Sequence, residues 1–202
     1  MAAALPGAAW AAAARSAPPV ILVVGDSLSA EYGIARGSGW VALLERRLAG
    51  KGVAARVVNA SVSGDTTAGG LARLPALLTS HRPTHVVLEL GGNDALRGLP
   101  LASTEKNLSK MVQLARSAGA QVLLVGMQVP PNFGGEHARR FAELFQSVAT
   151  QHKVAFVPFL LAGVADGPDP TRLFQADRIH PTAEAQPRML DNVWPALEKL
   201  LR

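Results

Sequence analysis

Five short runs of aliphatic and β-branched residues alternate along the chain with longer segments whose apolar positions recur at helical spacing. Runs of this length, bounded by glycine or polar turn residues, are typical of strands that are buried on both faces. They cover residues 20–24, 53–58, 84–90, 121–125 and 154–157. The pattern therefore predicts five buried strands separated by helices.

The intervening segments supply the helices. The apolar spacing predicts helices over residues 40–48, 66–79, 103–118, 135–152 and 181–201. Ser103 or Thr104 can cap the third of them, and Gly119 suits a left-handed residue just after its end. Prolines are expected to kink the second helix and to disturb the last one, at Pro75, Pro187 and Pro195.

Strands that alternate with helices predict βαβ units, and hence a parallel sheet that is covered on both faces. The crossovers of such units are nearly always right-handed. The fold class expected is therefore α/β: a three-layer α/β/α sandwich around a flavodoxin-like, five-stranded parallel sheet. A chain of 202 residues suits one such domain, which we expect to span residues 18–202.

Residues 1–17 differ from the rest because they are rich in alanine, which occupies ten of the 17 positions. Small residues at 14–17 resemble an export cleavage site, but no positive charge precedes Arg15, as a signal peptide requires. The segment is interpreted as a disordered tail or a degenerate signal. A periplasmic or secreted location is the expectation, with a cytoplasmic one as the alternative.

Composition limits the function classes. Hydrophobic residues make up 49% of the chain and charged residues 17%, which is enough apolar material for a core. The net charge of +5 raises the question of nucleic acid or anionic membranes, but the basic residues are scattered, with adjacent pairs only at 46–47 and 139–140. No apolar run approaches the ~20 residues of a membrane span. We therefore expect no nucleic-acid partner, and no integral membrane segment in the chain.

Cysteine is absent, which excludes disulfides, thiolate metal sites and a cysteine nucleophile. Four of the histidines show no metal-like spacing: His81, His85, His137 and His152. We therefore expect no metal and no cofactor.

Polar residues follow several predicted strands, and the carboxyl ends of parallel strands are where ligands bind. Gly-Asp-Ser-Leu-Ser (25–29) follows the first strand, and Asn-Ala-Ser-Val-Ser-Gly (59–64) follows the second. Gly-Gly-Asn-Asp (91–94) follows the third. A fourth polar segment, Asp-Arg-Ile-His-Pro (177–181), precedes the last helix. The first three loops are expected to open on one edge of the sheet.

These residue types fit acyl transfer, which needs a nucleophile, a base, a group that orients the base and donors for the oxyanion. Ser27 can be the nucleophile, His180 the base and Asp177 the group that orients it. The oxyanion donors would be the backbone N–H groups of Ser27 and Gly64 and the side-chain amide of Asn93. Each motif alone is a common turn or capping arrangement, but their joint occurrence in this order is specific.

Together these motifs resemble those of the SGNH hydrolases, also called GDSL esterases/lipases, over residues 18–202. The segments 25–33, 91–98 and 180–187 look most like the bacterial thioesterase I/arylesterase/lysophospholipase group. The resemblance implies that Ser27, Asp177 and His180 form the triad, and that Ser27, Gly64 and Asn93 form the oxyanion hole. Arg178 departs from the pattern, since the family often has glycine there, and it could alter the loop or attract anionic groups.

The resemblance implies a serine esterase that hydrolyses carboxylic esters, acyl-thioesters or both through an acyl-enzyme on Ser27, as a monomer or weak oligomer. Its partner would be a small-molecule acyl ester or thioester. Two alternatives stay open: a carbohydrate O-acetylesterase on the same fold, and a non-catalytic binding protein. The residues expected to contact substrate, or to shape the loops that do so, are Asp26, Leu28, Asp94, Pro130 and Phe133.

Overall fold

The computed structural model describes residues 17–129 and 133–202. Five parallel strands form one sheet in the order β2-β1-β3-β4-β5. Their bounds are β1 Val20–Gly25, β2 Arg56–Asn59, β3 His85–Glu89, β4 Gln121–Val125 and β5 Ala155–Val157. The strand order reverses between β1 and β3, which pair directly, and this switch point is where a parallel sheet opens a crevice. The predicted fold class is confirmed.

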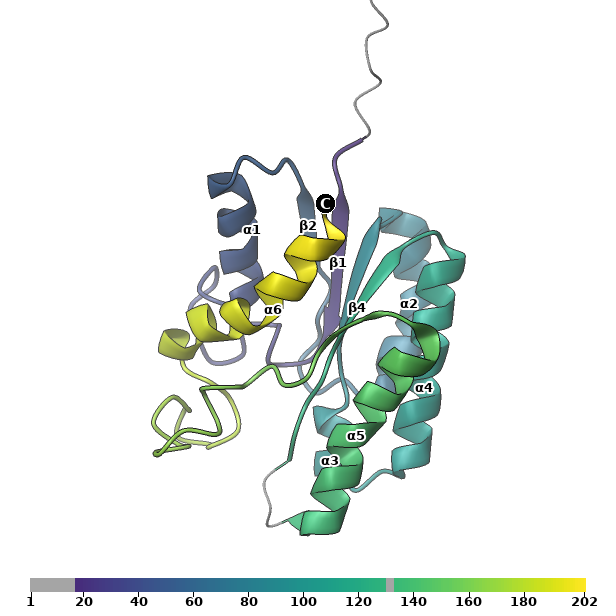
Figure 1. Ribbon diagram of the computed structural model, residues 1–202. Coiled ribbons are helices and arrows are strands. Elements are labelled where there is room, and N and C mark those ends of the chain that lie inside the picture. Colours follow the sequence, from purple (N-terminus) through teal and green to yellow (C-terminus); the bar gives the residue numbers. More distant parts are fainter. Residues whose placement is uncertain (1–16, 130–132) are drawn as a thin grey trace, which may run out of the picture.

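Helices cover both faces of the sheet, as Figure 1 shows. One face carries α1 (Trp40–Gly50) packed against α6 (Gln186–Leu200), and the other carries α2 (Thr67–His81), α4 (Leu101–Ser117) and α5 (Gly135–His152). A short helix, α3 (Gly92–Leu96), follows β3, and a 3₁₀ turn at Ala183–Ala185 precedes α6. The sheet is therefore the middle layer of three.

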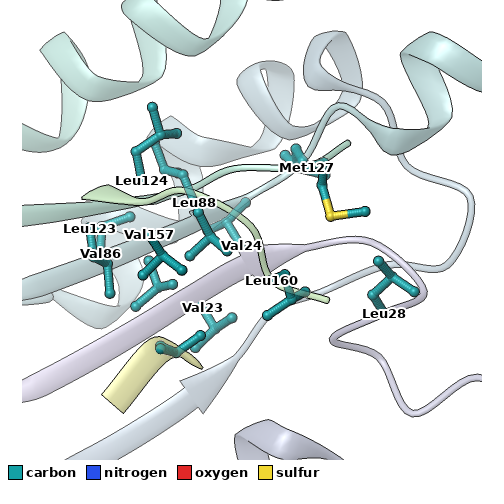
Figure 2. Packing of buried hydrophobic residues seen from close by; sticks show 14 of the residues in the cluster. Val23, Val24, Leu28, Val86, Leu88, Leu123, Leu124, Met127, Val157 and Leu160 are labelled. Carbon is teal, nitrogen blue, oxygen red and sulfur yellow. The ribbon is translucent and has the colours of Figure 1, made fainter. Parts of the chain in front are cut away.

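The core follows the apolar runs of the sequence. Strands β1 and β3 are almost wholly buried because helices cover both of their faces. Figure 2 shows part of this core between the strands and the loops that follow them. The residues labelled there are Val23, Val24, Leu28, Val86, Leu88, Leu123, Leu124, Met127, Val157 and Leu160. Leu28 belongs to this cluster, so the turn after β1 is anchored in the core.

Several predicted boundaries need correction. The second strand begins at Arg56 rather than residue 53. Helix α4 begins at Leu101 after Pro100, so neither Ser103 nor Thr104 caps it. Gly119 does adopt a left-handed conformation after that helix, with φ +83°.

The prolines behave differently from one another. Helix α2 continues through Pro75, and α6 continues through Pro195. The last helix begins at Gln186 rather than residue 181, so Pro187 lies in its first turn. A proline is well tolerated there because its missing N–H would have no partner within the helix.

No helix among residues 17–129 and 133–202 is long and apolar enough to cross a bilayer. The tail predicted over residues 1–17 lies outside the described residues except for Ala17.

Candidate active site

The predicted nucleophile lies on a tight turn that begins where β1 ends. The carbonyl of Asp26 accepts hydrogen bonds from the N–H groups of Ser29 (3.2 Å) and Ala30 (3.0 Å). Its side-chain Oδ1 accepts another from the N–H of Leu28, at 3.0 Å. Ser27 is thereby lifted out of the buried strand and becomes partly accessible. The next residue, Leu28, packs in the hydrophobic core and anchors the turn there.

Ser27, His180 and Asp177 form a continuous hydrogen-bonded chain. His180 Nε2 lies 2.9 Å from Ser27 Oγ. The other ring nitrogen, Nδ1, lies 2.6 Å from Oδ2 of Asp177. With the carboxylate accepting from Nδ1–H, Nε2 is left as an acceptor for the serine hydroxyl proton. The structure therefore brings together the three residues that the sequence singled out, although 153 positions separate the serine from the histidine.

The carboxylate of Asp177 is fixed by its own loop. Its Oδ1 accepts from the N–H groups of Ile179 (2.9 Å) and His180 (3.0 Å). These backbone bonds and the bond from the imidazole lower the pKa of Asp177 to about 2. Asp177 is therefore ionised at any pH at which an esterase would be assayed.

Arg178 adopts the left-handed conformation, with φ +57°. A glycine would take this conformation without the steric cost that a Cβ atom brings. This explains why glycine suits this position between the aspartate and the isoleucine. The arginine keeps the turn nonetheless, and its N–H donates to the carbonyl of Gln175 at 2.9 Å.

Two residues to which the sequence analysis gave no role support the histidine. Tyr32 packs against the imidazole of His180, with ring centroids 4.3 Å apart. The side-chain amide of Gln175 donates to the carbonyls of Tyr32 (2.9 Å) and Pro181 (3.1 Å), and its backbone N–H donates to the carbonyl of His180 (2.8 Å). Gln175 thus ties the histidine loop to the segment that follows the nucleophile. Glutamine at this position carries no recognisable sequence signal.

The predicted oxyanion donors lie on the three loops that follow β1, β2 and β3. Asn93 is in the first turn of α3, and its Nδ2 donates to Oδ2 of Asp26 at 3.1 Å. Gly64 has φ +79°, and its carbonyl accepts from the Arg97 guanidinium at 2.6 Å. Within residues 17–129 and 133–202, no acceptor pairs with the backbone N–H of Ser27 or of Gly64. Both N–H groups are thus available to a ligand.

The prediction that Asp94 contacts substrate needs correction. It is 2% exposed, and its carboxylate accepts from the N–H and hydroxyl of Thr67 and from the hydroxyl of Thr104. Because both oxygens are occupied inside the protein, Asp94 braces the loop that carries Asn93 and does not face a ligand. Asp26 is equally buried, so it acts on the site through Leu28 and Asn93 rather than by touching substrate.

A small hollow lies beside the serine and the histidine. Its lining residues are Ser27, Leu28, Glu31, Tyr32, Ile34, His180, Pro181 and Gln186. Leu28 is thus placed where the sequence analysis expected a substrate contact. Phe133 is exposed before α5 and does not line this hollow, and Pro130 lies outside the described residues.

Within the two described ranges, no group of three or more histidine, aspartate or glutamate side chains is arranged to hold a metal ion. The hydrogen-bonded side chains of Ser27, His180 and Asp177 offer the chemistry of a serine nucleophile with an imidazole base.

Comparison with known proteins identifies the family of this chain. Residues 23–187 match the GDSL-like lipase/acylhydrolase family. The chain is 54% identical to esterase TesA of Pseudomonas aeruginosa over 187 residues, which cover 93% of this chain and 92% of that protein. It is 39% identical over 186 residues to thioesterase 1/protease 1/lysophospholipase L1 of Escherichia coli K12, covering 92% of this chain and 86% of that one. A crystal structure of TesA superposes with a TM-score of 0.86 at 55% identity, covering 90% of this chain and 99% of that one. The chain therefore belongs to the GDSL-like lipase/acylhydrolase family, the SGNH hydrolases that its motifs resemble.

Proposed function

We propose that the protein is a serine hydrolase that cleaves carboxylic esters and acyl-thioesters through an acyl-enzyme on Ser27. The observation that carries the proposal is the imidazole of His180, which lies 2.9 Å from the serine hydroxyl on one side and 2.6 Å from the Asp177 carboxylate on the other. The names of its relatives, esterase TesA and thioesterase 1/protease 1/lysophospholipase L1, support these substrate classes.

Acylation begins when Ser27 Oγ attacks the acyl carbonyl carbon and passes its proton to His180 Nε2. The negative charge then develops on the former carbonyl oxygen. The N–H groups of Ser27 and Gly64 and the amide of Asn93 would donate to it, and one such donor is worth on the order of 10²–10³ in rate. As the tetrahedral intermediate collapses, His180 gives its proton to the departing alcohol or thiol.

Deacylation repeats the same steps with water. His180 removes a proton from a water molecule that attacks the acyl-enzyme, and the second tetrahedral intermediate releases the carboxylic acid and regenerates Ser27 Oγ–H. The ionised Asp177 stabilises the imidazolium in both halves and keeps the ring in the required orientation. The protein's own residues provide every proton transfer in this cycle.

The test is hydrolysis of p-nitrophenyl esters and acyl-CoA thioesters of two to sixteen carbons, by the wild type and by Ser27→Ala side by side. We expect turnover of both classes by the wild type and a loss of at least about 10³-fold in the variant. Ser29→Ala is unsuitable as a control because Ser29 contacts the same turn, so Ser147→Ala on the exposed side of α5 serves instead. Wild-type turnover in Ser27→Ala would refute the acyl-enzyme mechanism, and turnover of acetylated sugars alone would refute the acyl-chain substrates.

Export remains part of the proposal. The small residues in the alanine-rich segment before residue 18 support a periplasmic or secreted location. We also propose that the protein is a monomer or a weak oligomer. Mass spectrometry of the mature N-terminus in the native host tests the first, since an uncleaved Met1 in the cytoplasmic fraction would exclude export. Light scattering tests the second.

A further inference from the structure

Glu89, the last residue of β3, carries a carboxyl group into the interior of the protein. The residue has no exposed surface, and its neighbours in the chain, Leu88 and Leu90, have none either. Burying a carboxyl group among aliphatic side chains is costly unless its partners compensate. In the sequence it is the one charged residue of the apolar run 86–90. The position of this carboxyl group next to the nucleophile turn indicates a role in the site.

The carboxyl group lies directly beneath the turn that holds Ser27. Its Oε2 is 2.6 Å from the hydroxyl of Ser29 and 3.4 Å from the N–H of Asp26, so it contacts the residues on both sides of the nucleophile turn. Gly25 pairs with Glu89 across the sheet, and a Cβ atom on that glycine would come within 2.7 Å of Oε2. A glycine before the turn is therefore what makes room for the carboxyl group.

A chain of contacts continues from this carboxyl group to the predicted oxyanion hole. The Asp26 backbone N–H contacts Glu89, while the Asp26 side chain accepts from the N–H of Leu28 and from the amide of Asn93. One N–H of the Asn93 amide is held in this way, which leaves its other N–H for a further acceptor. In the opposite direction, the indole of Trp40 donates to the Ser29 hydroxyl at 3.1 Å.

The surroundings of the two carboxyl groups shift both pKa values upward. Burial and the neighbouring Asp26 raise the pKa of Glu89 well above its usual value. Burial raises the pKa of Asp26 to about 6, against the lowering effects of Leu28 N–H, Asn93 and His180, and Asp65 adds a small rise. Glu89 Oε1 is a buried oxygen with no hydrogen-bond partner in the described part of the chain. A neutral Glu89 beside an ionised Asp26 is the arrangement that these surroundings favour at neutral pH.

We propose that Glu89 is a positioning residue for acyl transfer, whose carboxyl group holds Asp26 and Ser29 in place around the nucleophile and, through Asp26, aims the Asn93 amide at the developing oxyanion. The inference rests on the proposed function. Glu89 touches neither substrate nor the reacting atoms, so its effect is confined to the alignment of groups that do.

Two replacements of similar size separate alignment from charge. Glu89→Gln keeps a neutral polar group that can bond to Ser29, so kcat should stay within about threefold of the wild type, with the same dependence on pH. Glu89→Met removes the bonds and keeps the volume. We expect it to lower kcat for a soluble p-nitrophenyl ester by about 10- to 100-fold, which is part of the effect of losing an oxyanion donor, while KM changes less than about threefold.

Active-site titration and inhibitor binding distinguish positioning from a merely structural role. Glu89→Met leaves the buried Ser29 hydroxyl and the Asp26 N–H without their acceptor, so its Tm should fall, and kcat is therefore expressed per titrated active site. A boronic acid, which forms a tetrahedral adduct on a nucleophilic serine, should bind Glu89→Met more weakly by the same factor as the fall in kcat. Leu88→Met, a substitution of similar volume on the same strand, should leave kcat unchanged.

The proposal is overturned if folded Glu89→Met keeps wild-type kcat, or if Glu89→Gln loses as much as Glu89→Met. It is also overturned if, in Glu89→Met, the Tm and the fraction of active sites that react with a covalent titrant fall while each remaining site turns over at the wild-type rate. Should Glu89→Met not fold, Ser29→Ala removes the 2.6 Å contact together with the hydrogen bond from Trp40, and it must lower kcat by at least about threefold, or the proposal fails. In all these outcomes the wild type still hydrolyses esters, whereas failure of the proposed function would leave the wild type itself inactive.

Discussion

Replacing Asp177 with asparagine should nearly abolish turnover while leaving the fold intact, for a reason that can be worked out from the loop. Oδ1 of Asp177 accepts two backbone N–H groups, at 2.9 and 3.0 Å. The amide oxygen of an asparagine must take that position, because an amide NH₂ cannot accept from an N–H. The NH₂ group is then directed at the imidazole.

The consequence falls on His180. An NH₂ group that faces Nδ1 requires that nitrogen to be the acceptor, so the ring proton moves to Nε2, 2.9 Å from the serine hydroxyl. A histidine in this tautomer cannot remove the serine proton. The same substitution in a serine protease lowers kcat by about 10⁴, which corresponds to about 5.4 kcal/mol of transition-state stabilisation.

The assay is kcat and KM for a soluble aryl ester at pH 7–8, with urea unfolding to confirm that the variant is folded. We expect kcat to fall by about 10³- to 10⁴-fold and KM to change little, because the carboxylate does not line the hollow beside Ser27. Asp169→Asn is the matched control: it removes a loop carboxylate that accepts from Thr171, outside the triad. A loss of less than about tenfold in folded Asp177→Asn would refute the assignment of the tautomer.

Three further predictions concern stability. Arg178→Gly should raise the free energy of unfolding by about 0.5–1 kcal/mol in urea titrations, because it removes the Cβ atom from a residue in the left-handed conformation. A decrease in the free energy of unfolding would contradict this. Asp94→Ala should lower it by about 2–4 kcal/mol, because it leaves the polar groups of Thr67 and Thr104 unpaired in the interior; a loss below about 1 kcal/mol would argue against the bracing role. The folded-state pKa of Asp26 is raised from 3.8 to about 6, so the native state binds more protons than the unfolded state between these values, and this carboxyl group lowers stability as pH rises from about 4 to 6. Asp26→Asn should therefore gain stability relative to the wild type over that range, whereas a constant difference between the two across pH 4–8 would count against the shift.

The layers and the triad were predictable because both depend on strong local patterns. The apolar runs that became β1 and β3 are buried on both sides, so their sequence shows little besides apolar residues. The polar residues placed directly after those runs necessarily reach the same edge of the sheet. Ser27 and Asn93 were found in this way, and the spacing of Asp177 and His180 gave the rest.

The supporting residues were not predictable to the same degree, because their roles come from contacts between distant segments. Asp94 follows Asn93 directly, yet its carboxylate turns inward to the start of α2, which the sequence did not indicate. Gln175 acts in part through a hydrogen bond to Tyr32 that spans 143 positions. Glu89 did leave a signal, a lone charge in a buried apolar run, and such a residue merits attention as a part of the site.

The most direct test of the central claim is covalent labelling of Ser27. A fluorophosphonate ester reacts with a serine that is activated by a neighbouring base, and intact-protein mass spectrometry followed by peptide mapping shows where it attaches. The account predicts one adduct per chain, on Ser27, formed in step with the loss of esterase activity and absent from Ser27→Ala. Complete inactivation with the label on any other residue, or an unlabelled Ser27 in fully active protein treated to completion, would contradict it.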